Sequence, residues 1–347
     1  MTEKKSAGYS TGEPALDQKI LELLDAAGIR GAQREYFEMV ATALRFGRQA
    51  TTPGDIRMIN QVLKEIRYAD AVFQPYRGVK KVTIFGSARV APDQPDWRMA
   101  RMFAERIAKA GFMVLTGGGE GIMGAAQLGA GKEMSFGLNI RLPYEQRPNE
   151  VIEGDRKLIF FRYFFTRKLH FVKESHAIAL FPGGFGTMDE CFEALTLMQT
   201  GKAPIVPMVF LEHPGGCYWS AFREFLNKEL LSRGLISEQD FYLFTFTDDL
   251  EEAVREIERF YHNFHSYRFV GDLLALRLHR APGDSDLAAI ERDFHDIVVG
   301  PGSFAKSGAL PPEANEPELL SLPRVCFPFD RRSFGRLRQL IDRLNEF

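Results

Sequence analysis

Nine consecutive residues combine a glycine-rich turn with acidic side chains: Pro182-Gly183-Gly184-Phe185-Gly186-Thr187-Met188-Asp189-Glu190. The three glycines let a ligand approach the backbone closely, and Thr187 offers both its hydroxyl and its backbone N–H. Where a helix begins at such a turn, its free N–H groups favour an anion such as phosphate. Glu190 then lies about one helical turn from the anion, where its carboxylate can stabilise positive charge on a ribose ring or orient a water molecule.

The same glutamate has a second interpretation. Thr187-x-x-Glu190 matches a capping box, in which the glutamate folds back onto the start of its own helix. On local sequence alone the capping box is favoured. Asp189 is rotated by about 100° from Glu190 around a helix, so the two carboxylates are not expected to act as a pair.

A second glycine-rich segment, Gly117-Gly118-Gly119-Glu120-Gly121-Ile122-Met123-Gly124, stands between a predicted strand and a predicted helix. Its backbone can also approach an anion, although such a segment alone equally fits a tight turn without a ligand. Its spacing is not the dinucleotide fingerprint, and no Gly-Lys-Ser/Thr closes it as in a triphosphate-binding loop. The two segments together favour a phosphorylated ligand and argue against a nicotinamide dehydrogenase.

Two basic residues, Arg167 and Lys168, lie in an aromatic-rich segment that we predict to be a helix over 160–173. One interpretation is a helix whose basic side chains are simply solvated. The other is contact with a phosphate or with a leaving group, for which arginine is the better bidentate donor. The local sequence does not decide between them.

The glycine-rich segments follow predicted strands. Short apolar strands are predicted at 81–86, 112–116, 135–140, 177–181 and 205–210. Helices are predicted at 97–110, 122–130, 160–173, 187–200 and 218–232. Strands without polar alternation that are separated by helices indicate a parallel sheet covered on both faces. The sequence therefore predicts an α/β fold with a Rossmann-like, doubly wound parallel sheet, in which ligands bind beyond the carboxyl ends of the strands.

The two ends of the chain differ from this central pattern. We predict a disordered lead-in over 1–14, a helical N-terminal extension over 15–75, the Rossmann-like domain over 76–262 and a C-terminal extension over 263–347. The C-terminal extension is expected to be mainly helical at 262–295, to continue as a long loop over 296–322, and to end in a strand at 324–329 and an amphipathic helix. We expect both extensions to serve packing or oligomerisation.

Composition narrows the function classes. The 347 residues carry a formal net charge of −2, which does not suggest a nucleic-acid partner. The three cysteines are too scattered for a disulfide framework or a Cys-x-x-Cys metal site. No apolar stretch approaches about 18 residues and no signal-peptide pattern opens the chain, so we expect no membrane segment and a cytoplasmic location.

These motifs together resemble the Lonely Guy family of cytokinin riboside 5′-monophosphate phosphoribohydrolases, often mislabelled as lysine decarboxylases. The family hallmark Pro-Gly-Gly-x-Gly-Thr-x-x-Glu is met without a mismatch by residues 182–190. Its Arg-Lys pair matches Arg167 and Lys168, and its triple-glycine segment ending in Met-Gly matches residues 117–124. The resemblance covers roughly 80–260. It is closest to the longer bacterial members, with a Gly-Ser after the first strand and Leu142-Pro143.

The resemblance implies hydrolysis of the bond between base and ribose in a nucleoside 5′-monophosphate, either AMP-like or a cytokinin riboside monophosphate. It implies that Arg167 and Glu190 are catalytic. It implies that substrate is bound by the following residues: Gly86, Ser87, Gly117, Gly118, Gly119, Gly121, Met123, Lys168, Gly183, Gly184, Gly186 and Thr187. Family sites are built at a dimer interface, so a homodimer or higher homo-oligomer is implied, with no metal and no organic cofactor.

Two departures separate the chain from the family pattern. The usual Met-His-Glu before the Arg-Lys pair is Phe164-Phe165-Thr166 here, and the triple-glycine segment is one residue shorter than in plant members. Cytokinin specificity is therefore not implied. The alternative is a non-catalytic nucleotide or cofactor carrier of the same fold, as in molybdenum-cofactor carrier proteins. Pyridoxal-dependent lysine decarboxylation is disfavoured, because no cofactor-lysine context is recognisable.

Overall fold

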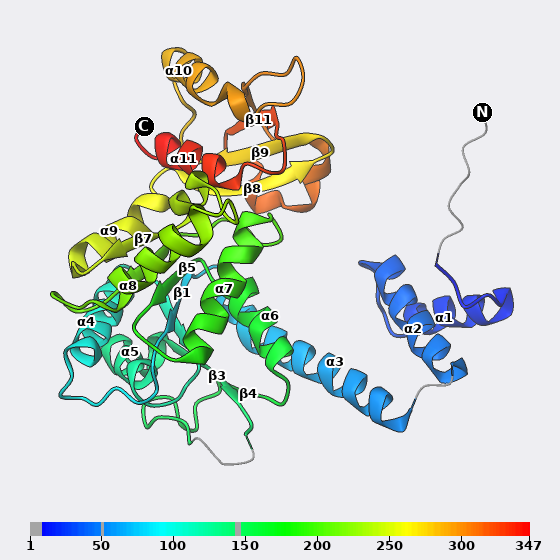
Figure 1. The fold of residues 1–347 in the computed structure, drawn as a ribbon. Helices are drawn as coiled ribbons and strands as arrows, with labels where there is room; N and C mark the ends of the chain where they lie inside the picture. The colour runs from blue at the N-terminus through cyan, green and yellow to red at the C-terminus, as the bar shows by residue number, and fades with distance from the viewer. Residues whose placement is uncertain (1–8, 50–51, 143–146) are drawn as a thin grey trace. The chain divides into compact units, whose positions relative to one another are not determined.

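Five short apolar strands form where the sequence predicts them, and two more join them in one parallel sheet (Figure 1). The predicted strands are β1 (Lys81–Phe85), β2 (Met113–Thr116), β3 (Ser135–Ile140), β5 (Ala177–Leu180) and β6 (Met208–Leu211). The added strands are β4 (Leu158–Phe161) and β7 (Thr245–Thr247). The computed structural model describes residues 9–49, 52–142 and 147–347. The chain divides into two compact units, residues 1–68 and 69–347.

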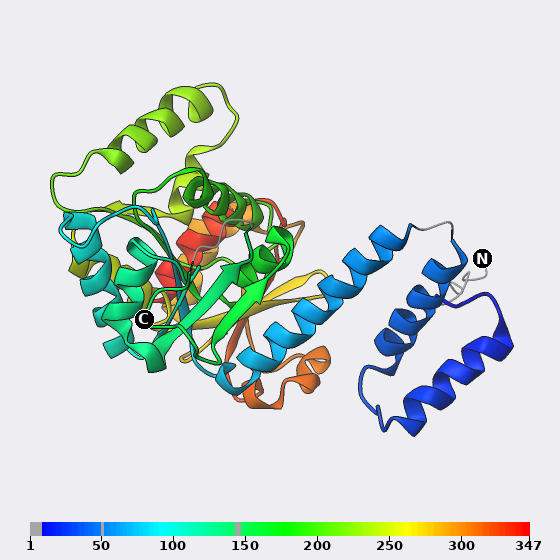
Figure 2. The ribbon, with the colours of Figure 1, turned by 90° about the horizontal axis from the view of Figure 1, so that it is seen from below.

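Helices cover both faces of this sheet, as Figure 2 shows from below. Val82 and Ile84 of β1 pack on one face, against α4 (Pro95–Lys109), α5 (Ile122–Ala130) and α9 (Leu250–Phe260). Leu180 and Phe210 pack on the other face with α7 (Phe185–Gln199) and α8 (Tyr218–Phe225), and Phe171 brings α6 (Phe164–Glu174) onto the same sheet. The structure thus confirms the predicted Rossmann-like α/β fold.

The strand order is β4-β3-β2-β1-β5-β6-β7, with every neighbouring pair parallel. The chain therefore winds away from β1 in one direction and away from β5 in the other. Phe85 and Leu180, at the ends of these two strands, are register partners. The loops that follow them must leave in opposite directions, which opens a crevice where such folds bind ligands.

Two predicted helices need correction. Phe160 and Phe161 belong to β4, paired with Asn139 and Ile140 of β3, and α6 begins only at Phe164. The extended backbone of Tyr163 separates the strand from the helix. The helix predicted over 218–232 is α-helical only to Phe225 and continues as a π-helical turn over Leu226–Leu231.

The C-terminal region is not mainly helical over 262–295, as the sequence analysis predicted. Residues Phe264–Val270 (β8) and Leu273–Leu278 (β9) form a hairpin around Gly271-Asp272. Ala305–Ser307 (β10) and Arg324–Pro328 (β11) complete an antiparallel sheet of order β10-β11-β9-β8. Only α10 (Asp284–Phe294) is helical in the corrected range, while α11 (Phe334–Leu344) follows as predicted. Alternation in β9 explains the strand, because Leu274 and Leu276 point into the core that contains Phe210.

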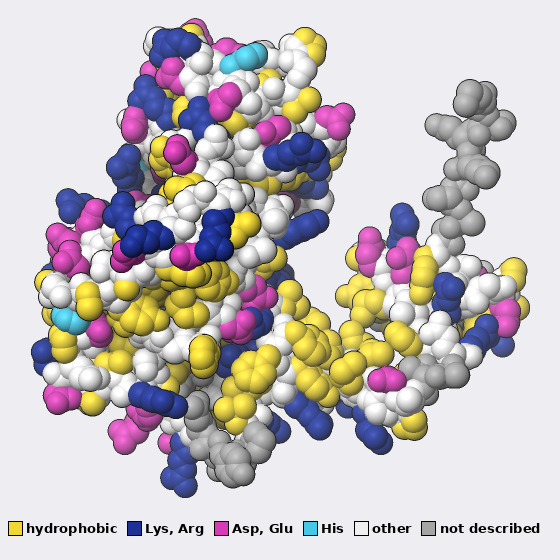
Figure 3. Space-filling view, in the orientation of Figure 1, with side chains coloured by type: hydrophobic (Ala, Val, Ile, Leu, Met, Phe, Trp, Pro, Cys, Tyr) yellow, Lys and Arg dark blue, Asp and Glu magenta, His cyan; other side chains and the backbone are white. Residues whose placement is uncertain are grey.

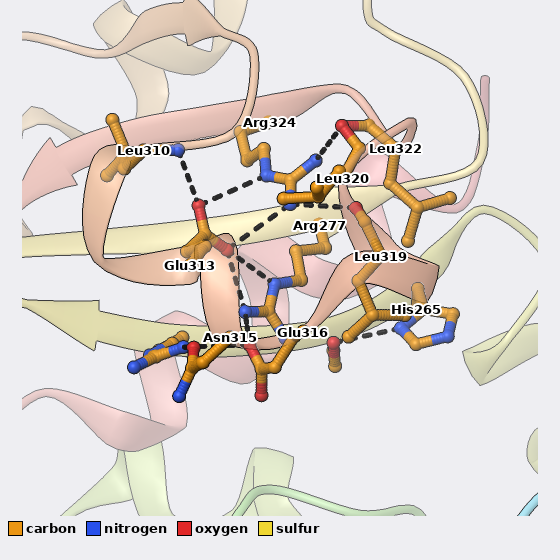
Figure 4. A network of polar contacts seen from close by, with 12 residues as sticks. His265, Arg277, Leu310, Glu313, Asn315, Glu316, Leu319, Leu320, Leu322 and Arg324 are labelled. Atoms are coloured by element: carbon orange, nitrogen blue, oxygen red, sulfur yellow. Dashed lines mark hydrogen bonds and ion pairs between the residues drawn. The ribbon is translucent and has the colours of Figure 1, made fainter.

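A buried charge network holds the connection between β10 and β11 on this second sheet (Figure 4). Glu313 is fully buried, and its carboxylate accepts hydrogen bonds from Arg277 Nε at 2.8 Å and from Arg324 Nε at 3.3 Å. Burial alone would raise the pKa of Glu313. The N–H of Leu310 and the two guanidinium groups outweigh it, so this pKa lies below its ordinary value. The predicted long loop therefore contains short 3₁₀ turns, at Pro311–Asn315 and Pro317–Leu319. The ion pairs of Glu313 with Arg277 and Arg324 hold it against the sheet.

The N-terminal unit consists of helices, as predicted. In it α1 (Pro14–Ala26) and α2 (Gln33–Arg48) pack through Ile20, Leu24 and Ala41. The long helix α3 (Pro53–Phe73) contains the boundary between the two units. Residues 1–8 of the predicted disordered lead-in lie outside the described residues, and so does Pro143. Within the described ranges, no helix has the length and apolar character needed to cross a membrane.

Candidate active site

A cleft of about 730 Å³ opens at the carboxyl ends of β1 and β5, the point where the strand order reverses. Four connections and four helices of the second unit contribute to it. The lining residues are Phe85, Gly86, Ser87, Ala88, Arg89, Gly117, Met123, Ile140, Leu142, Phe164, Arg167, Phe171, Gly183, Gly184, Phe185, Gly186, Thr187, Met188, Glu190 and Tyr218. The structure thus brings together ten of the fourteen residues proposed from the sequence.

Ser87 joins the three glycine-containing loops of the cleft. Its backbone N–H donates to the carbonyl of Pro182 at 3.1 Å, and its carbonyl accepts from the N–H of Ile122 at 3.0 Å. Gly121 lies with φ of +68° against this carbonyl, where a Cβ would overlap the oxygen. A Cβ on Gly183 would likewise overlap the side chain of Thr187. Glycine at these two positions allows the loops to pack against one another.

The loop after β5 ends in an uncapped helix. Helix α7 begins at Phe185, with Gly184 as its N-cap and with no side-chain hydrogen bond from that cap. The capping box favoured by local sequence is therefore wrong, because the helix starts before Thr187 and Glu190 falls in its second turn. The first N–H groups of a helix have no partner within the helix and carry its positive dipole end. Gly184, Gly186 and Thr187 line the cleft at this end, which suits an anion.

Arg167 and Glu190 face each other inside the cleft. Arg167 Nη2 lies 3.6 Å from Glu190 Oε1, and only 6% of Glu190 is exposed. The guanidinium lies over the rings of Phe164 and Phe171, with 5.0 Å and 5.7 Å to the ring centroids. Burial raises the pKa of Glu190 to about 7, against the opposing effect of the Lys168 and Arg167 charges. Burial also lowers the pKa of Arg167, against the opposing effect of Glu190. A carboxyl that titrates near neutrality in a cleft is a candidate for chemistry.

Lys168 lies outside the cleft lining. Its Nζ is 2.8 Å from Asp189 Oδ2 and 2.8 Å from Glu193 Oε2. Burial acts to lower its pKa, but these two hydrogen bonds raise it. Lys168 therefore ties α6 to α7 and offsets part of the negative charge of the two carboxylates near Glu190.

The loop after β2 contributes Gly117 to the lining, and the start of α5 contributes Met123. Gly118, Gly119 and Gly121 lie behind it. Asn149 holds this part of the loop, since its backbone N–H donates to the Gly118 carbonyl at 2.9 Å and its Nδ2 donates to the Gly119 carbonyl at 2.8 Å. These glycines shape the loop rather than face the cleft.

Three kinds of lining residue were missed by the sequence analysis. Arg89 follows β1 by four residues, and Tyr218 begins α8 after β6. The Tyr218 hydroxyl donates to the Gly183 carbonyl at 2.6 Å, so α8 supports the glycine loop. Phe164, Phe171 and Phe185 supply apolar surface. Position after the carboxyl end of a predicted strand was the available signal for Arg89 and Tyr218.

The described residues contain no group of three or more His, Cys, Asp or Glu side chains arranged to hold a metal ion. All three cysteines, Cys191, Cys217 and Cys326, are free thiols.

Comparisons with known proteins bear on the family. Residues 120–257 match the family model described as possible lysine decarboxylase. A search of curated proteins gives no significant match.

Several solved structures resemble about half of this chain at a distance. The structural-genomics target TM1055 is 21% identical over 52% of this chain and 99% of its own, with a TM-score of 0.38. The molybdenum cofactor carrier protein from Chlamydomonas reinhardtii is 21% identical over 52% of this chain and 97% of its own, with a TM-score of 0.36. DNA processing protein A from Helicobacter pylori is 16% identical over 53% of this chain and 82% of its own, with a TM-score of 0.37. Similarities of this size carry no argument about activity.

The family match contains α6 with Arg167 and the whole segment from Pro182 to Glu190. The matched segment, residues 120–257, thus resembles the family described as possible lysine decarboxylase, in agreement with the Lonely Guy resemblance of the sequence motifs.

Proposed function

We propose that this protein hydrolyses the N-glycosidic bond of nucleoside 5′-monophosphates, AMP-like or cytokinin riboside monophosphate, releasing the free base and ribose 5-phosphate. One observation carries the proposal. Glu190, with a pKa of about 7, lies buried in the second turn of the helix whose uncapped N-terminus lines the same cleft. An anion-accepting end and a titratable carboxyl are thus about one helical turn apart.

In the proposed complex the 5′-phosphate lies at Gly184, Gly186 and Thr187. The ribose then extends toward Glu190, and the base contacts the aromatic side chains of α6. Breaking the bond to the base develops positive charge on the sugar ring, which an ionised Glu190 stabilises more in the transition state than in the ground state. Water adds its oxygen to C1′ of the ribose, and its two protons are shared between the new hydroxyl and the departing base.

Arg167 has a supporting role in this proposal. Its charge opposes the effect of burial on Glu190 and so increases the ionised fraction of that carboxyl near neutral pH. Its buried Nε has no hydrogen-bond partner among the described residues. That N–H is available to a substrate oxygen or to the departing base. The proposed reaction uses no metal and no organic cofactor.

We also propose that the protein acts as a homodimer or higher homo-oligomer in the cytoplasm. Large apolar side chains are exposed beside the cleft: Phe160, Phe164, Phe165, Leu169 and Phe185. Phe185, the first residue of α7, is 97% exposed. Hydrophobic side chains gather on the face that carries α6 and α7 in Figure 3, which supports an interface there. Three free cysteines and a nucleotide substrate fit a reducing compartment.

The test is base release from a panel of nucleoside monophosphates and the matching nucleosides, measured by chromatography. We expect release from monophosphates only. Glu190→Gln should abolish it, whereas Asp189→Asn, on the exposed side of the same helix, should retain most of it. Tight nucleotide binding without release in the wild-type protein would instead indicate a binding or carrier protein.

A further inference from the structure

The basic residues of α6 are already occupied by carboxylates. Arg167 lies against Glu190, and Lys168 lies between Asp189 and Glu193. A phosphate dianion placed beside either residue would also approach these carboxylates. The positive charge that a phosphate needs must therefore come from elsewhere in the cleft.

The N-terminus of α7 supplies only part of that charge. A helix end is equivalent to about half an elementary charge, whereas a phosphate monoester carries close to two at neutral pH. A side chain with a full positive charge near this helix end would offset more of the negative charge of the phosphate.

Arg89 meets this requirement. It lines the cleft, its side chain is exposed, and among the residues that the structure describes no carboxylate forms an ion pair with its guanidinium. Its backbone is fixed, since its N–H donates to Ser87 Oγ at 3.1 Å. Ser87 in turn donates its N–H to the carbonyl of Pro182, directly before the glycine loop.

We infer that Arg89 binds the 5′-phosphate of the substrate together with the N-terminus of α7, and that it makes the protein select phosphorylated over unphosphorylated nucleosides. This inference rests on the proposed function, because it assigns a residue to the same cleft. The guanidinium can donate two parallel hydrogen bonds to phosphate oxygens, which a lysine ammonium cannot reproduce.

The division of labour follows from position. Glu190 and Arg167 lie on α7 and α6, whereas Arg89 belongs to the loop after β1. Arg89 is accordingly a binding residue whose loss acts on affinity for the phosphate and leaves recognition of the nucleoside in place.

The experiment measures binding without turnover. In the Glu190→Gln background, isothermal titration calorimetry follows AMP, adenosine and ribose 5-phosphate binding to the parent, to Arg89→Ala and to Arg89→Lys. Arg98→Ala serves as the matched control, because Arg98 is an exposed arginine at the start of α4 that is absent from the cleft lining and whose side chain donates to the Asp93 carbonyl.

We expect Arg89→Ala to weaken AMP and ribose 5-phosphate binding by about 10- to 100-fold, the range for a lost charge-assisted contact. Adenosine binding should change by less than about 2-fold by the same reasoning, since no phosphate is present. Arg89→Lys should retain part of the affinity, and Arg98→Ala should behave like the parent.

Unchanged AMP binding by Arg89→Ala, or an equal loss for AMP and adenosine, would overturn the inference. A parent protein that does not bind AMP would overturn it as well. The proposed function fails separately. AMP binding that depends on Arg89 in a wild-type protein without base release would refute the hydrolase and keep the phosphate site. Base release by a protein whose AMP binding does not depend on Arg89 would keep the hydrolase proposal and refute the phosphate site at Arg89.

Discussion

Replacing Glu190 with glutamine should stabilise the folded protein at alkaline pH while it removes catalysis. Glu190 is 6% exposed, and its nearest cation is 3.6 Å away. Its ionised form is therefore poorly compensated in the fold, and burial raises its pKa from 4.5 to about 7. Glutamine has a similar shape and no charge, so it avoids this cost.

The magnitude follows from linkage. Between pH 4.5 and about 7 the folded state holds a proton that the unfolded state has released, so stability falls as the pH rises. The loss of unfolding free energy caused by ionising Glu190 is absent below pH 4.5 and complete above pH 7. The rise in pKa from 4.5 to about 7 makes this loss about 3 kcal/mol. Glu190→Gln should therefore gain up to about 3 kcal/mol over wild type at pH 8, but less than about 1 kcal/mol at pH 5.

Urea unfolding of both proteins at pH 5 and pH 8 measures this difference. Asp189→Asn is the matched control on the same helix. It loses an ion pair in which Asp189 is 59% exposed, and Lys168 keeps its second partner Glu193, so the change should shift stability by about 1 kcal/mol or less at both pH values. If Glu190→Gln were destabilised equally at pH 5 and pH 8, burial would not be the origin of the raised pKa and the reasoning would fail.

Three further outcomes are expected. The wild-type kcat/KM for AMP should rise with pH through about 7 and then level off, because the ionised Glu190 is the active form; a rate that falls through this range would assign the protonated form instead. Gly183→Ala should lower the melting temperature, since its Cβ would overlap Thr187. In contrast, Gly184→Ala should melt like wild type but bind AMP weakly, because no described atom lies within 4 Å of its Cβ and the methyl group would occupy ligand space. Glu313→Gln should destabilise the protein on the order of 3 kcal/mol in urea unfolding, because two buried arginines lose their shared carboxylate (Figure 4); a change below about 1 kcal/mol would show that Glu316 suffices.

Sequence patterns identified those strands whose apolar run is clearly bounded along the sequence. Apolar runs bounded by glycine or by charged residues gave β1, β2, β3, β5 and β6. They missed β4, because its apolar residues run into the aromatic start of α6 with only Arg162 and Tyr163 between them. The two-residue turn Gly271-Asp272 between alternating strands was a hairpin signal that the sequence analysis did not use. Strand order, and with it the position of the cleft, depends on contacts between distant segments that no local pattern encodes.

The site shows a similar division. The motif pointed to Glu190, and the cleft indeed contains this residue beside Arg167. Local sequence could not separate glycines that pack from glycines that face open space. Gly121 and Gly183 are confined by side chains or backbone of other loop residues, whereas nothing described lies near a Cβ at Gly186. At Gly121 that distinction depends on the carbonyl of Ser87, which is far from it in sequence.

The arrangement of charges between α6 and α7 explains why Glu190 stays available. Lys168 forms ion pairs with Asp189 and Glu193, each at 2.8 Å. Arg167 is therefore the cation that lies against Glu190. Their separation of 3.6 Å is too long for a strong hydrogen bond. A shorter, bidentate contact would stabilise both side chains, but it would also lower the pKa of Glu190 and occupy its oxygens. The looser contact makes the folded protein less stable than a close ion pair would. In return, Glu190 titrates near pH 7 and its oxygens can contact a ligand. The stabilising effect expected of Glu190→Gln and the loss of catalysis expected of the same change thus have one physical origin.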